Sequence, residues 1–298
     1  MSSRKFAVIA VLAVTACGGG LYGGDAGSGI DTTGADVPAS FTSASDAAKA
    51  AAMIASLLVP GGITAKSMTT TACAGSGYAT FTTDDTTAYP DDGRHVYSQC
   101  DSGGGERTIF NGVTVDHCNT TASNDSVCTN DSVTSGENGV PFTFEQRSSS
   151  ADTILRFLTT GVQIKNGATS TEIGSGVIES ENLLSHKSIA TVNDNLAIST
   201  TTQGNGSLTA TANGTFGLND AARSTANCIS GRMTVSTPTT LTLDTNENFT
   251  GGQLHFTSDS GNTADVIFHS DGSVSASFNG GASQNISKTL LATYCSVD

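Results

Sequence analysis

The chain has 298 residues and is acidic, with 27 Asp and Glu side chains against 13 Lys and Arg. Its formal net charge of −14 would repel nucleic-acid phosphates and anionic lipid surfaces, which argues against a nucleic-acid partner. Charged residues make up only 13% of the chain, whereas Gly alone accounts for 34 residues and Ser, Thr and Asn are abundant. Such a composition favours a β-protein with many turns.

The first sixteen residues have the layout of an export signal. Arg4 and Lys5 precede an apolar stretch, residues 6–14, that is too short to cross a membrane as a stable helix. Removal of this segment, residues 1–16, leaves 11 basic and 27 acidic side chains, a formal charge of −16. We therefore expect an exported chain.

The end of this signal carries a more specific motif. Val14, Thr15, Ala16 and Cys17 resemble the lipobox of bacterial lipoproteins, with Val in place of the commoner Leu at the first position. The resemblance implies that Cys17 becomes the N-terminus and carries lipid, palmitate included. Gly18 replaces the Asp that retains lipoproteins at the inner membrane, which implies the outer membrane. The alternative is an ordinary signal peptide with a chance cysteine.

A flexible tether is expected after the lipidated cysteine. Residues 17–42 are dominated by Gly, Asp, Ser and Thr, with too few apolar residues to offset the entropy of ordering. The remaining residues, 43–298, then form a β-rich domain. Two modules that meet near residue 150 are the alternative to one.

One segment has the pattern of a helix, residues 45–58, in which small and apolar residues recur at helical spacing. Ser45 or Asp46 can cap its start, and Pro60 ends it. We expect this helix to pack on the domain's own sheet. A membrane-surface helix would be richer in cations, and Lys49 is the only one here.

Short strands with apolar residues at every second position follow from residue 63. Three of them, residues 253–257, 264–269 and 273–278, predict a meander, in which His255 is expected near Val266. Hairpin connections predict an antiparallel sheet, folded as a sandwich or a barrel. The absence of helices between the strands argues against a doubly wound α/β enzyme fold. Other expected strands are residues 78–82, 108–115, 142–146 and 154–158.

Six cysteines remain after the lipidated one, and an even number in an exported chain indicates disulfides. We favour the local pairing, which joins the first to the second, the third to the fourth and the fifth to the sixth. A zinc site is the rival interpretation, but no Cys-x-x-Cys pair occurs. The six are Cys73, Cys100, Cys118, Cys128, Cys228 and Cys295.

The last quarter of the chain resembles a loose group of uncharacterised β-rich bacterial lipoproteins. The resemblance implies a lipid-anchored β-domain and no activity. It is carried by Cys228, Gly231, residues 233–235, Thr237, Pro238, Leu241, Gly252, Leu254, Phe256 and Cys295.

Ser102 is the candidate nucleophile of an enzyme. The run Asp101, Ser102, Gly103 and Gly104 is similar to the sequence around the nucleophile of chymotrypsin-like proteases. In that family the catalytic His lies well upstream, whereas here His95 is only seven residues away. A glycine-rich hairpin loop accounts for the same residues without chemistry.

Calcium is the candidate ion for this acidic chain. Asp244, Asn246 and Asn248 have the alternate spacing that opens an EF-hand loop. The pattern then fails, because Phe249 stands at the position of the conserved bend Gly and His255 at that of the bidentate Glu. A polar turn between strands is the better explanation, and no cofactor is expected.

These features together predict a lipid-anchored cell-envelope protein with a non-catalytic β-domain. Its expected partners are the membrane, through the lipid, and a protein or a glycan of the envelope. The side of the outer membrane that it faces is left open. A lipid-anchored hydrolase that uses Ser102 is the alternative.

Overall fold

The computed structural model describes residues 33–35, 37–57, 71–83, 93–103, 106–118, 130–135, 142–148, 153–166, 169–182, 187–219, 228–246 and 248–295. Its helical elements are η1 (Thr33–Ala35), α1 (Ala44–Leu57) and α2 (Lys288–Thr293). Its strands are β1 (Thr71–Ala72), β2 (Ser76–Thr83), β3 (Gly93–Asp101), β4 (Glu106–Cys118), β5 (Asn130–Ser135), β6 (Phe142–Ser148), β7 (Thr153–Asn166), β8 (Thr169–Asn182), β9 (Ser188–Thr202), β10 (Leu208–Asn219), β11 (Gly231–Leu243), β12 (Phe249–Ser258), β13 (Thr263–Phe268), β14 (Val274–Phe278) and β15 (Gln284–Ile286).

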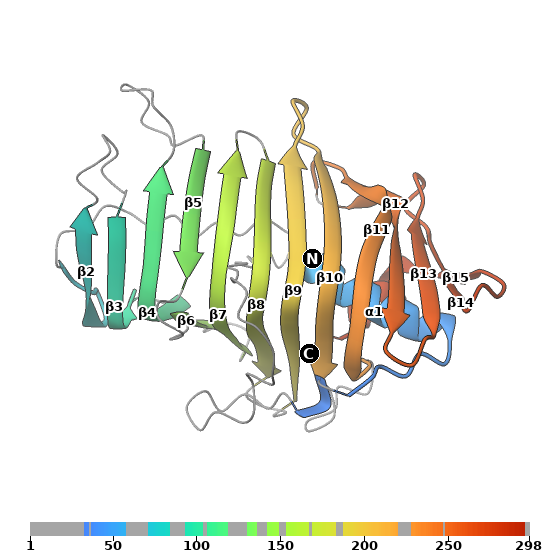
Figure 1. The fold of residues 1–298 in the computed structure, drawn as a ribbon, viewed down its shortest axis with the longest axis horizontal. Helices are drawn as coiled ribbons and strands as arrows, with labels where there is room; N and C mark the ends of the chain where they lie inside the picture. Colours follow the sequence, from blue (N-terminus) through green and yellow to red (C-terminus); the bar gives the residue numbers. More distant parts are fainter. Residues whose placement is uncertain are drawn as a thin grey trace.

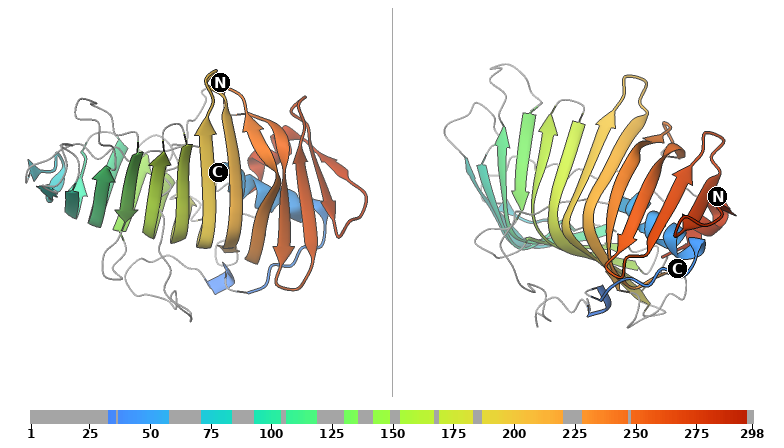
Figure 2. Two further views of the ribbon diagram at one scale, coloured as in Figure 1. Left: turned by 45° about the horizontal axis from the view of Figure 1, so that its top comes forward. Right: turned by 45° about the vertical axis from the view of Figure 1, so that its right-hand side comes forward.

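The described strands form one antiparallel sheet of 15 strands (Figure 1). They follow chain order from β1 to β15, except that β6 pairs with β4 and β7 beside the main path. The sheet curves along its length but does not close into a barrel (Figure 2). The predicted antiparallel, mainly β class is thus confirmed, as an open curved sheet.

The predicted C-terminal meander is present as β12, β13 and β14, joined by tight turns. Its register differs from the expectation, because His255 pairs with Asp265 and not with Val266. The turn explains the shift of one position. Ser258 donates its N–H to the carbonyl of Asn262 and so closes a five-residue loop between Thr257 and Thr263.

Helix α1 lies behind the C-terminal strands in Figure 1 and packs against β13 and β14. It begins at Ala44, close to the expected start. The capping residue is Ser43 and neither of the two expected, because the Asp46 N–H is donated to Ser43 Oγ. The Asp46 carboxylate in turn accepts from the backbone N–H and the hydroxyl of Thr42, at 3.0 and 2.9 Å. Pro60, the expected end of the helix, lies outside the described residues.

The face of the sheet that α1 covers is called the inner face below, and the opposite one the outer face. The inner face of β10 to β14 carries the main core, in which Phe256 is fully buried between Phe41 and Phe216. Alanines on α1, among them Ala47 and Ala51, are also fully buried there. Their small side chains let the helix approach the sheet closely.

Residues 33–35 and 37–41 fall within the expected tether but pack on the sheet, so the expected boundary at residue 43 is wrong. Pro38 forms a parallel bridge with Arg232 at the start of β11, and Phe41 is 1% exposed. Gly231 makes this approach possible. It has a φ of +123°, and a Cβ on it would lie 2.4 Å from Ala39 Cα. The polar composition around this segment gave no signal that Ala39 and Phe41 are buried.

Two of the three expected disulfides are present, Cys73–Cys100 and Cys228–Cys295. Of the third expected pair, Cys128 lies outside the described residues, so its pairing with Cys118 stays a prediction.

The expected boundary near residue 150 falls between β6 and β7, which pair with each other along six residues. Among the described helices, none is long and apolar enough to span a membrane.

Candidate functional site

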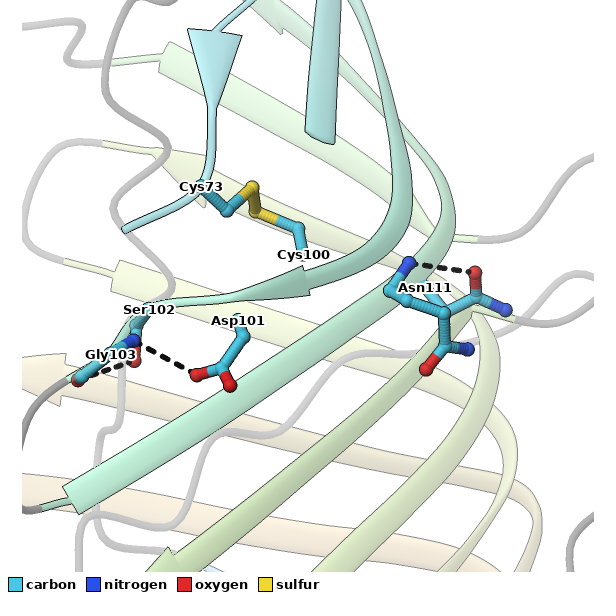
Figure 3. Close-up of a disulfide and its surroundings, with 7 residues drawn as sticks. Cys73, Cys100, Asp101, Ser102, Gly103 and Asn111 are labelled. Atoms are coloured by element: carbon cyan, nitrogen blue, oxygen red, sulfur yellow. Dashed lines mark hydrogen bonds between the residues drawn. A yellow bond between two sulfur atoms is a disulfide. The ribbon is translucent and has the colours of Figure 1, made fainter. Parts of the chain in front are cut away.

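Ser102 lies in an exposed loop directly after β3, next to the Cys73–Cys100 disulfide (Figure 3). The preceding Asp101 is buried, and its carboxylate accepts the N–H of Gly103 at 2.9 Å. Ser102 Oγ donates to the carbonyl of Gly103 at 3.4 Å.

Packing accounts for the glycines around this serine. Gly103 has a φ of +69°, and a Cβ there would lie 3.2 Å from the backbone nitrogen of Gly75. Gly75 in turn donates its N–H to the carbonyl of Asp101, at 2.9 Å. The glycine therefore lets two loops joined by the nearby disulfide lie close together, which is the structural role that a glycine-rich loop predicts.

The expected histidine partner, His95, is not brought to Ser102. His95 is buried near the other end of β3, where its ring stacks on Tyr97 at a centroid distance of 6.3 Å. A strand rises about 3.3 Å per residue, so seven residues place roughly 20 Å between the Cα atoms of His95 and Ser102. The side chain of His117 lies outside the described set. The strand therefore keeps Ser102 and His95 apart as a nucleophile and its base.

The Asp244 turn is satisfied by its own hydrogen bonds. Oδ1 of Asp244 accepts the N–H of Asn246 at 2.8 Å and that of Asn248 at 2.9 Å. The Asn248 side-chain amide donates to both carboxylate oxygens, and these bonds from Asn248 lower the pKa of Asp244. The three expected calcium ligands thus form an exposed capped turn between β11 and β12, in which the Asp oxygens receive donors from the chain itself.

No group of three or more His, Cys, Asp or Glu side chains suited to a metal ion occurs among the residues that the structure describes. Calcium binding by Asp244, Asn246 and Asn248 would have to displace the bonds just described. The expectation of no cofactor stays a prediction.

The outer face of β12 and β13 holds a polar cluster that sequence reasoning missed, here called the His255 cluster: Gln253, His255, Thr257 and Asp265. Asp265 Oδ1 accepts from Gln253 Nε2 at 2.8 Å and lies 2.9 Å from His255 Nδ1. A carboxylate can only accept, so Nδ1 carries the proton. In the neutral ring Nε2 is then an acceptor, 3.4 Å from the Thr257 hydroxyl.

This arrangement presents a fixed imidazole to solvent. The side chains of His255 and Asp265 are 33% and 28% exposed, so the cluster is accessible from the outer face. The order of carboxylate, imidazole and hydroxyl is that of a catalytic triad. The 3.4 Å contact with Thr257, however, exceeds the roughly 2.8 Å of a strong hydroxyl hydrogen bond. The geometry is better suited to accepting a hydrogen bond from a ligand hydroxyl at Nε2.

Hydroxyl side chains continue from this cluster across the outer face. Thr257 pairs in register with Thr234 on β11, which pairs with Thr215 on β10, where the two hydroxyls are 3.4 Å apart. Further along, Thr169 and Thr201 make a hydroxyl pair at 3.0 Å between β8 and β9. These parts of the outer face therefore present groups that both donate and accept hydrogen bonds. On β8 and β9 the same face also carries a buried apolar cluster, in which Val177, Ala190 and Val192 pack against Ala35.

The signal that could have revealed the His255 cluster is its spacing. Gln253, His255 and Thr257 occupy alternate positions on β12, so they share one face of the strand. The correct register then adds Asp265 to that face. The error of one residue in the register put the expected partner of His255 on the wrong face.

Comparison of the chain with protein-family models, curated proteins and solved structures finds no match. The function therefore has to be argued from the chain's own residues.

Proposed function

We propose that the chain is a lipid-anchored cell-envelope protein, held at the outer membrane by a lipid on Cys17, whose β-domain has a binding or structural role and no catalytic one. The export signal and the lipobox-like residues support the anchor and its location. The β-domain supplies the recognition surface.

The observation that carries this proposal is the His255 cluster on the outer face. Its side chains are partly exposed, and their mutual hydrogen bonds hold them in place. Groups fixed before binding lose less conformational entropy when a ligand arrives. Hydroxyl, amide and imidazole groups suit a partner that is rich in hydroxyl groups, such as an envelope glycan. A polar surface of an envelope protein is the alternative partner.

Binding is tested with the purified mature lipoprotein and isolated envelope glycans, measured by co-sedimentation. His255→Ala together with Asp265→Ala removes the fixed imidazole, and we expect the bound fraction to fall at least tenfold. Thr169→Val, on the same face but distant from the cluster, is the matched control and should bind as the wild type does. Equal binding by the double variant would exclude the cluster as the recognition site.

The anchor is tested separately with Cys17→Ser. Cells that express the wild-type chain and are fed an alkyne-labelled palmitate analogue should yield a labelled protein in the outer-membrane fraction. The variant should be unlabelled and should leave that fraction. Label retained on the variant would refute lipidation at Cys17, whatever the outcome of the binding assay.

A further inference from the structure

The sequence contains six Asn-Gly pairs, and the structure describes both residues in four of them. The backbone nitrogen that follows an Asn can attack the side-chain amide of that Asn, and Gly offers the least hindered nitrogen because it has no side chain. The attack needs rotation of the Asn backbone and side chain, which a fold permits at some positions and prevents at others. The four described pairs begin at Asn111, Asn205, Asn213 and Asn279.

Two of these pairs are held within strands. Asn111 pairs with Thr143 on β6, and Asn213 pairs with Ala197 on β9. In a strand the side chain stands out of the plane of the sheet, whereas the next peptide nitrogen continues along the strand. Strand pairing therefore keeps the amides of Asn111 and Asn213 away from the nitrogen that would attack them.

The Asn279 pair lies in an exposed turn after β14, but Asn279 is tied to the start of β13. Its Oδ1 accepts the N–H of Thr263 at 2.8 Å, and its Nδ2 donates to Asn262 Oδ1 at 3.1 Å. The Asn279 N–H also donates to the carbonyl of Thr263 at 2.8 Å. The amide cannot turn toward Gly280 without leaving these bonds.

Asn205 lies at the tip of the β9–β10 hairpin, which projects beyond the neighbouring strands in Figure 1. Both Asn205 and Gly206 are exposed, and a Cβ on Gly206 would have only Thr245 Cγ2 within 4 Å, at 3.6 Å. The Gly206 N–H donates to the carbonyl of Gln203 at 2.8 Å, and this bond has to open before the nitrogen can react. An exposed tip outside the strand ladder opens at low cost.

The hydrogen bonds of the Asn205 side-chain oxygen come from within the same tip. Asn205 Oδ1 accepts the N–H of Ser207 at 3.0 Å and the hydroxyl of Ser207 at 2.7 Å. Negative charge develops on this oxygen when a nitrogen adds to Cγ, so both donors point at the place where an oxyanion forms. Opening of the bond from Gly206 to Gln203 does not by itself break them.

We propose that Asn205 is a site of spontaneous deamidation, with water as the only other reactant. The Gly206 nitrogen loses its proton to solvent and bonds to Cγ of Asn205. The bond from Cγ to Nδ2 breaks, and Nδ2 takes up one proton from solvent and leaves as ammonia. Water then opens the cyclic imide, at Cγ to give aspartate at position 205 or at the backbone carbonyl to give isoaspartate. Either product adds a negative charge to the tip. This modification goes beyond the proposed binding role and does not depend on it.

The test uses the purified mature chain, incubated at mildly alkaline pH, digested, and analysed by mass spectrometry with isoaspartate standards. In the folded protein we expect Asn205 to convert at least tenfold faster than Asn111, Asn213 and Asn279. In urea the four should convert at comparable rates, because each is followed by Gly. Conversion of Asn205 no faster than that of Asn279 in the folded protein would overturn the proposal. So would a lead of Asn205 that persists unchanged in urea, because the local sequence and not the folded tip would then cause it.

The variant Ser207→Ala removes the hydroxyl donor and keeps the backbone N–H, so conversion of Asn205 should slow at least threefold. Ser273→Ala is the matched control and should leave the rate at Asn205 unchanged. Ser273 also follows a Gly in a hairpin turn, where its N–H donates to Asp271 Oδ1 at 2.8 Å. An unchanged rate in Ser207→Ala would overturn the role of the hydroxyl. A faster rate would show that the bonds from Ser207 protect the amide, and would overturn the site as argued.

Discussion

Removal of the Cys228–Cys295 disulfide should destabilise the protein more than removal of Cys73–Cys100. The first bridge closes a separation of 67 residues and the second one of 27. The loop-entropy relation gives a loss of about 4.4 kcal/mol for the longer loop and about 3.5 kcal/mol for the shorter one. The longer bridge also holds the C-terminus on α1, where Tyr294 shares a 2.9 Å hydrogen bond with Ser45.

The assay is urea unfolding of the oxidised protein at 25 °C, followed by circular dichroism. We compare the wild type with the two double variants Cys228→Ala/Cys295→Ala and Cys73→Ala/Cys100→Ala. The free energy of unfolding should fall in both, and by about 1 kcal/mol more in the first. If the first variant is as stable as the wild type, or loses less stability than the second, the reasoning from loop length and C-terminal docking is refuted.

Three further substitutions test individual positions. Asp46→Ala should lower the free energy of unfolding by about 1 to 2 kcal/mol at pH 7, because the carboxylate that accepts from the N–H and the hydroxyl of Thr42, just before α1, is lost. Burial raises the pKa of Asp46, but hydrogen bonds from Thr42 and Lys49 outweigh it, so the net pKa is lowered. The wild type should therefore lose its advantage over Asp46→Ala as the pH falls through that lowered pKa. Urea unfolding at pH 7 and pH 3 should show the difference in free energy of unfolding between the two proteins shrinking, and a constant difference would contradict this expectation. Gly231→Ala should lower the free energy of unfolding by at least about 2 kcal/mol more than Gly261→Ala in the same assay. A Cβ at Gly231 meets Ala39, whereas one at Gly261 has nothing within 4 Å. Equal losses of stability would disprove the close approach of Gly231 to Ala39. Ser102→Ala should leave stability within about 0.5 kcal/mol of the wild type and leave any ester turnover intact, and a loss of turnover would favour the hydrolase.

Local sequence signals were sufficient for the class of fold. The alternation of apolar residues in β12 to β14 and the Gly, Asn and Asp residues between them predict antiparallel hairpins, and these signals act over a few residues. The 45–58 pattern located α1 within a residue of its observed bounds. The disulfides Cys73–Cys100 and Cys228–Cys295 followed from pairing cysteines in chain order.

The functional surfaces depended on the tertiary structure. The His255 cluster exists because a five-residue turn sets Asp265 opposite His255, and a shift of one residue moves a side chain to the other face. The residues around Ser102 resemble those around a catalytic serine, but β3 holds Ser102 far from His95. The four-residue motif around Ser102 does not encode that distance.

Sequence by itself determined the acidic composition, the lipobox-like residues before Cys17 and the mainly β class, because composition, short motifs and periodicity are local properties. Only the tertiary structure decided that residues 37–41 join the core and that, among the described residues, the Thr191 hydroxyl and the Asn193 side-chain oxygen are buried with no hydrogen-bond partner. Burial depends on what packs from distant parts of the chain. Phe41 has mostly polar neighbours in the sequence, but its ring contacts that of Phe256, more than two hundred residues away. The sheet, and not the segment 37–41 itself, sets that contact.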